Sequence, residues 1–520
     1  MMSKSYSRAR PSRDYWFLIT VIALGIGLRV VAFPDIPPGL HRDEASVGYE
    51  TLALIQTQSD RWGIPLPVYF ISWGSGQSVL YSYLSIPAVL TFGLSRFSVR
   101  LLSIVVGILT LPLMYVTSRR TLGKHAAMLT TLLLAVMPWH IMISRWALDA
   151  NLLPFFLLLG TYTVARALEQ TSARSITAFL PWALGLYTYA TAYVTVPILL
   201  IGTAWFYRTT LVKHWRVWAM AFGLFGVLSF PIGLFLFKNF VWTDWPIDQF
   251  LGLGIPRIPF SRLAQISAPL PDRWINNFFI IVNGFQDHEL VNTIPGIPLI
   301  FLAVLSLSLV GAVYLLQHRR STNLFLLWFG ACVPLFFPWK LTSTHINAIY
   351  IPMLAIAAWG FLKLRQALGS PRARQIFVGG LAGICVVHLL VFLSAYYFLY
   401  PKQPEVELAF DRGFDRAIYK GLEIAQPAEP ILVTDRISLP YILVAFHTAY
   451  PSAQFQQEVQ RAYENDAIQV YSIGRFYFGS DNLRDPHAPL TFVLAKWDND
   501  PCTAPQFFLE TRLWKVGKCK

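Results

Sequence analysis

The chain has 520 residues, of which 55% are hydrophobic and only 13% charged, and its mean hydropathy is +0.48. Soluble domains use fewer apolar and more charged residues, so this composition excludes an ordinary soluble globular protein. The net charge of +14 does not indicate a nucleic-acid partner, because the basic residues are scattered between apolar runs rather than gathered on a soluble domain.

The first apolar run, residues 15–33, follows a basic N-terminal segment, residues 1–14, and no small-residue cleavage site comes after it. A cleaved signal peptide would have such a site, so we expect an uncleaved transmembrane helix with its N-terminus in the cytoplasm. Arg29 lies near the outer end of this run. Its side chain either extends to the membrane surface or faces a polar cavity.

The basic clusters that follow mark cytoplasmic loops, because short cytoplasmic loops hold an excess of Lys and Arg. These clusters are Arg119 to Lys124, Arg166 to Arg174, Arg208 to Arg216, Arg319 with Arg320, and Lys363 to Arg374. If every cluster lies in the cytoplasm, the chain must cross the membrane an even number of times between successive clusters. From the apolar runs between them, we predict about 11 transmembrane helices, with a range of about 10 to 13.

Two apolar runs, residues 78–93 and 99–117, lie between the first span and Arg119, but the alternation allows only one of them to cross. Residues 78–93 are the shorter run and contain Pro87. We therefore predict that they form an interfacial or re-entrant helix in a first outer loop, residues 34–96. Structureless loops of that length are uncommon unless functional, so this loop should contain helices of its own.

A second long outer loop, residues 238–295, holds several Trp and acidic residues, and an aromatic belt at the membrane surface explains the Trp but not the length. From residue 400 the apolar runs shorten to strand length, as in PILVTD and LTFVLAKWD. We predict a transmembrane domain at residues 15–399 and a small extracytoplasmic α/β domain at residues 400–520. Within it, Cys502 and Cys519 either pair or stay reduced.

The densest polar cluster next to a membrane helix follows the first span, in the segment PDIPPGLHRDEASVGYE. Asp43 and Glu44 suit the N-terminus of a helix, and capping needs only one of them. A carboxylate beside apolar walls can also act as a general base, with His41 and Arg42 adjacent. A divalent-metal site is not favoured, because one His and two acids without a second ligand cluster support it only weakly.

Four segments carry a resemblance to a known family: HRDEASVGYE, DRWGIPLP, YSYLSIPAVLTFGLSRFSVRLLSIVVGILTLPLMYVTSRRTLG and PWHIMISRWALDANLLPFFLLLGTY. They resemble the family 39 branch of the GT-C glycosyltransferases, which includes protein O-mannosyltransferases and lipid A aminoarabinose transferases. The resemblance covers residues 15–210 well and the later helices loosely. It implies a polytopic α-helical GT-C membrane fold. It also implies an enzyme, usually inverting, that moves a hexosyl or pentosyl group from a polyprenyl-phosphate carrier to a protein, lipid or glycan. The expected location is a bacterial inner membrane, with the reaction at its extracytoplasmic face.

By this resemblance Asp43 corresponds to the family's catalytic acid and Glu44 to its companion. Asp43 would take the proton of an acceptor hydroxyl as that hydroxyl attacks the anomeric carbon. The leaving phosphate needs cationic or hydrogen-bonding partners. Candidates for binding the donor phosphate or the substrate are His41, Arg42, Arg145, Asp149, Lys340, His345 and Asn347. For Arg145 and Lys340, contact with lipid headgroups is the alternative. Aminoarabinose transferases carry basic residues just after the acidic pair, where this chain has Ala45 to Gly48, so the donor sugar stays open.

Three classes of function fit an integral membrane protein with an elaborate outer face: a lipid-carrier-dependent glycosyltransferase, a transporter or flippase of lipid-linked saccharides, and a non-catalytic scaffold. A transporter should place ionisable groups near the middle of the bilayer, but the predicted helices contain almost no Asp, Glu or Lys. This favours the enzyme, for which a divalent metal cofactor is possible but not favoured.

Overall fold

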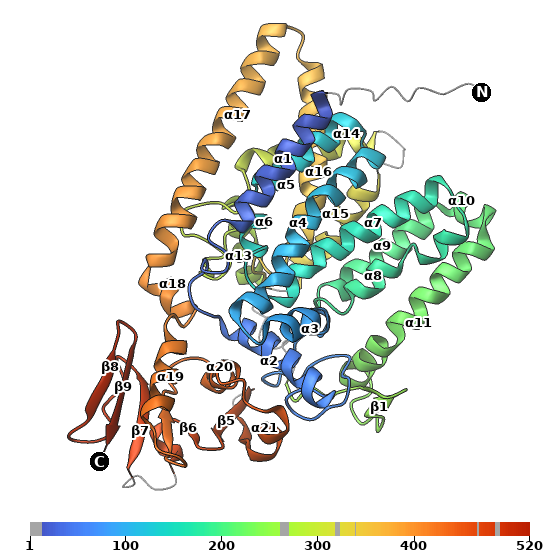
Figure 1. Cartoon of the computed structure of the whole chain (residues 1–520). Helices are drawn as coiled ribbons and strands as arrows, with labels where there is room; N and C mark the ends of the chain where they lie inside the picture. The colour runs from blue at the N-terminus through green and yellow to red at the C-terminus, as the bar shows by residue number, and fades with distance from the viewer. Residues whose placement is uncertain are drawn as a thin grey trace, which may run out of the picture.

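The computed structural model describes residues 13–260, 270–317, 323–338, 340–464, 467–483 and 489–519. A helical bundle carries a sheet domain at one end (Figure 1). The first turn of α1 (Arg13–Val30) and the turn into α17 (Pro371–Ser394) lie at the other end of the bundle. The helix α2 (Arg42–Thr57) lies beside the sheet domain, next to α20 (Pro440–His447).

Helices make up most of residues 13–402. The bundle begins with α1, α4 (Arg96–Thr121), α5 (Lys124–Val136), α6 (Pro138–Ile143), the 3-10 turn η1 (Asp149–Leu152) and α7 (Leu153–Glu169). It continues with η2 (Ala173–Thr177), α8 (Leu180–Gly185), α9 (Ala192–Phe206), α10 (Arg208–Lys213) and α11 (Trp215–Phe240). A short hairpin, β1 (Gln249–Phe250) with β2 (Leu253–Gly254), precedes α13 (Leu270–Val282), α14 (Leu302–Leu316), α15 (Asn323–Cys332), η3 (Val333–Phe336), α16 (Asn347–Ala367) and α17.

Within the described residues, five helical stretches are long and apolar enough to cross a membrane: α4, η1 with α7, α11, α16, and α17 with the turns after it. Five shorter apolar helices accompany them. This pattern fits the predicted polytopic membrane protein. One of the apolar runs counted as spans, residues 176–188, differs, because the α-helix within it is only the six-residue α8. Pro181 stands in the first turn of α8, where its missing N–H group removes no intrahelical hydrogen bond.

The apolar run at residues 78–93 folds as α3 (Leu80–Phe92), which packs between α2 and α4. A helix of 13 residues is about 20 Å long, shorter than the hydrocarbon core of a bilayer. That this run does not span stays a prediction.

Arg29 in α1 is fully buried and joins α1 to α5. Its guanidinium donates hydrogen bonds to the carbonyl oxygens of Gly25, Leu134 and Ala135 and lies 2.5 Å from Nδ1 of His140. The carbonyl groups of Leu134 and Ala135 belong to the last turn of α5, which has no intrahelical partners for them. Extension of Arg29 to the membrane surface is thus wrong, since the side chain satisfies a buried helix end.

The terminal domain is a mixed sheet of seven strands in the order β4-β5-β6-β3-β7-β9-β8. The central β3 (Ile431–Val433) is parallel to both β6 (Phe476–Phe478) and β7 (Leu490–Ala495), and the other pairs are antiparallel. The remaining elements are α18 (Pro404–Ala409), α19 (Phe414–Ile424), α20, α21 (Ser452–Glu458), β4 (Gln460–Glu464), β5 (Ala467–Ile473), β8 (Gln506–Glu510) and β9 (Trp514–Cys519). The predicted segments PILVTD and LTFVLAKWD supply β3 and β7, whose residues are all buried.

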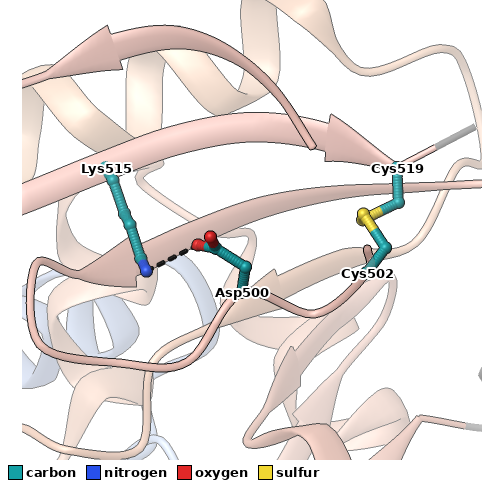
Figure 2. Close-up of a disulfide and its surroundings, with 4 residues drawn as sticks. All are labelled: Asp500, Cys502, Lys515 and Cys519. Carbon is teal, nitrogen blue, oxygen red and sulfur yellow. Dashed lines mark hydrogen bonds and ion pairs between the residues drawn. A yellow bond between two sulfur atoms is a disulfide. The ribbon is translucent and has the colours of Figure 1, made fainter. Parts of the chain in front are cut away.

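Cys502 and Cys519 form a disulfide that ties the loop before β8 to the end of β9 (Figure 2). Beside it, Nζ of Lys515 donates a hydrogen bond of 2.7 Å to Oδ1 of Asp500 in the same loop. The loop is therefore held to β9 by a covalent link and an ion pair. Of the two pairing states left open by the sequence, the structure has the disulfide.

Replacing both cysteines of this disulfide by Ser should destabilise the terminal domain by about 3 kcal/mol, because the unfolded chain regains the entropy of a loop of this size. Thermal unfolding and limited proteolysis of the purified protein measure the change. The control is Cys385→Ser, which removes a half-buried free thiol from α17. Equal melting temperatures for the double variant and this control would contradict the expectation.

Candidate active site

The first turn of α2 presents two adjacent carboxylates, and its N-terminal cap explains why the helix begins there. The Nδ1 atom of His41 accepts a hydrogen bond of 3.2 Å from the backbone N–H of Asp43, and the Glu44 carboxylate accepts one of 3.1 Å from the backbone N–H of His41. This reciprocal arrangement satisfies two N–H groups that the helix itself leaves unpaired. An accepting Nδ1 carries no proton, so the His41 ring is neutral, and burial lowers the pKa of His41.

Glu44 is completely buried in an ion pair with Arg100 of α4. Oε1 accepts from Nε of Arg100 at 2.7 Å and Oε2 accepts from Nη2 at 2.6 Å, which is the bidentate geometry of a strong Arg–carboxylate pair. Oε1 also accepts from the backbone N–H of Ala147 at 2.9 Å. Both carboxylate oxygens are therefore occupied by protein donors, and we assign Glu44 to anchoring α2 rather than to catalysis.

Arg100 also holds the segment before α2. Its guanidinium donates to the carbonyl oxygens of Pro34 at 2.6 Å, Pro37 at 2.8 Å and Gly39 at 3.1 Å. Sequence reasoning missed this residue, because it stands near the start of a run predicted to span. The available signal was an Arg within an apolar segment, since buried charges need partners.

A cavity of about 930 Å³ lies in front of α2. It is bounded by both outer loops, by the turns after α6 and α8, by the loop before α16 and by Ala409 of α18. Several aromatic side chains line it, namely Tyr69, Trp73, Trp146, Tyr189, Tyr193, Phe235 and Phe240. Its polar lining includes His41, Arg42, Asp43, Gln77, Asp149, Asp287, His288, Glu289, Asn292 and His345.

The two carboxylates of the first turn of α2 differ in what they face. The Asp43 side chain is 23% exposed and lines the cavity, whereas the Glu44 side chain is 0% exposed. Oδ2 of Asp43 lies 3.5 Å from Nδ1 of His41, and because that ring is neutral this contact is not an ion pair. Among the described residues, no Lys or Arg lies within ion-pair distance of Asp43. The Asp43 carboxylate can therefore accept a proton or a hydrogen bond from a molecule in the cavity.

Four of the predicted binding residues line the cavity: His41, Arg42, Asp149 and His345. Asp149 accepts from the backbone N–H groups of Ser78 at 3.1 Å and Ala150 at 2.8 Å, so it also shapes the wall. Nδ1 of His345 accepts from the backbone N–H of Thr342 at 3.0 Å. These residues come from three different outer segments, which the fold brings together around one space.

The other three predicted residues, Arg145, Lys340 and Asn347, do not belong to the described lining. Arg145 is buried and donates to the carbonyl oxygens of Arg29 at 2.6 Å and Ile36 at 3.2 Å. Its guanidinium also stacks over the rings of Tyr396 and Tyr397. This position replaces the predicted contact with a donor phosphate or with headgroups, because the backbone carbonyls and rings draw the side chain inward.

Lys340 and Asn347 depart from the prediction in different ways. Lys340 is exposed. Asn347 is buried, and its Oδ1 accepts a hydrogen bond of 2.8 Å from Nε1 of Trp139. Both residues follow the apolar run at residues 323–338. Their position in the sequence, just after this run, does not determine where their side chains point.

Residues 287–289 contribute polar groups that sequence reasoning did not assign to the site. Asp287, His288 and Glu289 line the cavity next to the segment that carries Thr342 to His345, to which Asp287 is hydrogen-bonded through the backbone N–H of Ser343. Burial raises the pKa of Glu289, the carboxylates of Asp287 and Asp43 raise it further, and Arg42 opposes them. The described residues contain no group of three or more His, Cys, Asp or Glu side chains arranged to hold a metal ion.

Glu44→Gln should destabilise the protein by about 3–5 kcal/mol, because it leaves the buried Arg100 cation without its counter-charge. A Gln side chain keeps one acceptor oxygen but turns an amide N–H₂ toward the guanidinium. Thermal unfolding of the purified protein in detergent measures the loss. Asp43→Asn, one residue earlier, should melt close to the wild type, and a Glu44→Gln variant that melts with the wild type would contradict the anchoring role.

The comparisons with known proteins agree with this architecture. Residues 78–232 match the family described as dolichyl-phosphate-mannose-protein mannosyltransferase. No curated protein matches the chain. The solved structure of apo ArnT from Cupriavidus metallidurans superposes with a TM-score of 0.61 and 13% identity, covering 98% of each chain.

A second structure of the same ArnT, bound to undecaprenyl phosphate, superposes with a TM-score of 0.57 and 15% identity, again covering 98% of each chain. At these identities the likeness concerns the fold, including the terminal sheet domain. The resemblance predicted from the sequence is confirmed: the chain is similar to GT-C glycosyltransferases related to O-mannosyltransferases and lipid A aminoarabinose transferases.

Proposed function

We propose that this chain is a membrane glycosyltransferase that moves a monosaccharide from a polyprenyl-phosphate donor to a protein, lipid or glycan acceptor. One observation carries the proposal: Asp43 faces a large cavity while the adjacent Glu44 is fully engaged by Arg100. A cavity of this volume accommodates a sugar and a phosphate group together. The similar fold of ArnT, which has been solved with undecaprenyl phosphate bound, supports the class of donor.

In the proposed reaction, Asp43 acts as the general base. Its carboxylate accepts the proton of an acceptor hydroxyl, and the hydroxyl oxygen forms a bond to the anomeric carbon of the sugar. The bond between that carbon and the phosphate oxygen breaks, and the electron pair leaves with the polyprenyl phosphate. Attack opposite to the leaving group inverts the anomeric centre. A base of this kind contributes roughly 10²- to 10⁴-fold to the rate.

Arg42 is the proposed partner of the leaving phosphate. It lines the cavity directly beside Asp43. A guanidinium can donate two parallel hydrogen bonds to a phosphate, and its charge stabilises the negative charge that develops as the glycosidic bond breaks. The other cations predicted for this role are less suitable, since Arg145 is engaged by backbone carbonyls and Lys340 is exposed outside the cavity lining.

We also propose that the cavity and the terminal domain lie on the extracytoplasmic side of a bacterial inner membrane, with the N-terminus in the cytoplasm. Figure 1 supports this orientation, since the start of α1 and the turn into α17, both next to basic clusters, lie at the end opposite the sheet domain. Short loops rich in Lys and Arg stay in the cytoplasm. The Cys502–Cys519 disulfide suits an oxidising compartment.

Asp43→Asn should lower the rate of sugar transfer by roughly 10²- to 10⁴-fold without changing thermal stability, because the amide cannot accept the proton. Transfer is measured with the purified protein in lipid vesicles, using a panel of undecaprenyl-phosphate sugars and a membrane extract as acceptor source. Asp35→Asn is the matched control, since Asp35 lies in the same outer loop with its side chain 75% exposed. Turnover by Asp43→Asn at the level of this control would refute Asp43 as the base.

The proposed orientation predicts the labelling of single cysteines by a membrane-impermeant maleimide. Glu423→Cys on α19, with a side chain that is 66% exposed, should react in intact cells. Arg372→Cys, exposed at the start of α17, should react only after the membrane is permeabilised. The reverse pattern would contradict the orientation.

A further inference from the structure

The loop between α13 and α14 presents a carboxylate, Glu289, to the same cavity as Asp43. The two residues before it, Asp287 and His288, fix the position of Glu289. Oδ1 of Asp287 accepts from the backbone N–H of Glu289 at 3.0 Å, and Oδ2 accepts from the backbone N–H of Ser343. Both carboxylate oxygens of Asp287 thus accept backbone hydrogen bonds that hold the loop in place.

The loop is fixed at further points beyond Asp287. Nδ2 of Asn292 donates a hydrogen bond of 2.7 Å to Oγ1 of Thr344, and the hydroxyl of Tyr400 donates one of 2.6 Å to the carbonyl of Leu290. The backbone N–H groups of Asn292 and Thr293 both donate to the carbonyl of Glu289 at 2.9 Å. The first two bonds tie the loop to the segment before α16 and to the turns that follow α17, and the last two lie within the loop, so Glu289 sits on a rigid support.

His288 adopts the left-handed backbone region, with φ of 61°. This region is unfavourable for residues with a Cβ atom, and it persists only where the surrounding structure imposes it. The conformation turns the chain at the residue that precedes Glu289. Together with the fixed points on both sides, it sets the direction in which the Glu289 side chain leaves the backbone.

The Glu289 carboxylate has no hydrogen-bond donor among the described residues, in contrast to Glu44 and Asp287, whose oxygens are occupied. Arg42 and Asp43 lie close enough to act on it electrostatically. Glu289 therefore lines the same cavity as the proposed base and the proposed phosphate-binding cation.

The chemistry of the donor restricts what a carboxylate can contact there. A carboxylate and a phosphate are both acceptors and repel each other, so Glu289 is unsuited to the phosphate. The hydroxyl groups of a sugar are donors, and two of them on adjacent carbons can bind one carboxylate. Partly buried aromatic side chains in the lining, such as Trp73 and Tyr189, offer apolar surfaces for the faces of a sugar ring.

We propose that Glu289 binds hydroxyl groups of the sugar that is transferred and so helps to determine which sugar the protein accepts. This inference rests on the proposed function, because it assumes a sugar in the cavity. In this arrangement Arg42 recognises the lipid phosphate, and Glu289 distinguishes the glycosylated carrier from the bare one.

Binding of the bare lipid carrier, compared with binding of its glycosylated forms, tests this assignment. The probes are undecaprenyl phosphate and its mannosyl, glucosyl and galactosyl forms, and their Kd values are measured with the full-length protein in nanodiscs. For the form that the wild type binds most tightly, Glu289→Gln should raise Kd by about 10- to 100-fold, the range of one or two hydrogen bonds to a charged group. Its Kd for undecaprenyl phosphate should stay within about 2-fold of the wild type.

Two further variants complete the design. Asp244→Asn removes one negative charge from the same outer loop at an exposed position and should leave both Kd values unchanged. Arg42→Gln should raise the Kd for the bare lipid and for the glycosylated lipid to the same extent. Unchanged binding of the glycosylated lipid by Glu289→Gln, or an equal loss for both lipids, would overturn the sugar contact. If the wild type binds none of the lipids, the proposed function itself fails.

Discussion

The buried ion pair between Glu44 and Arg100 is the interaction on which the rest of the site depends. Both side chains are completely excluded from solvent. Burying two charges is costly, and here the cost is offset by bidentate geometry and by hydrogen bonds to the carbonyls of Pro34, Pro37 and Gly39. The pair joins the first turn of α2, the segment before it and α4, and Ala147 adds the turn after α6. It holds Asp43 at the cavity wall and gives two adjacent acids separate roles.

The terminal domain completes this frame. The backbone N–H of Leu40 donates a hydrogen bond of 2.7 Å to the carbonyl of Phe410, directly before the first turn of α2. Gly39 has φ of +67°, and a Cβ atom there would lie 2.1 Å from the Phe410 oxygen, so only glycine allows this approach. The helices α20 and α21 pack along α2. The domain therefore supports α2, the helix that carries Asp43.

Much of this architecture follows from the sequence, for identifiable reasons. The apolar runs, the Pro and Gly residues before Asp43 and the short strands after residue 400 each produce the predicted kind of element. Roles within the site are harder to predict. Successive residues on a helix point about 100° apart, so Asp43 and Glu44 face different surroundings, and only the position of Arg100 shows which one is bound. Likewise, the Arg145 side chain donates to buried backbone carbonyl groups, and no sequence pattern predicts these partners. Glu289 and Asp43 line the same cavity because two loops that are distant in the sequence fold together.

In the proposed reaction, this chain adds one sugar to an envelope molecule through chemistry at Asp43. Mass spectrometry of envelope glycans, lipids and glycoproteins tests this reaction in cells that lack the protein and are complemented with either the wild type or Asp43→Asn at equal abundance. We expect the mass of one monosaccharide to be lost from a defined set of molecules and to return only with the wild type. An envelope that is unchanged by deletion, or restored by Asp43→Asn, would contradict it.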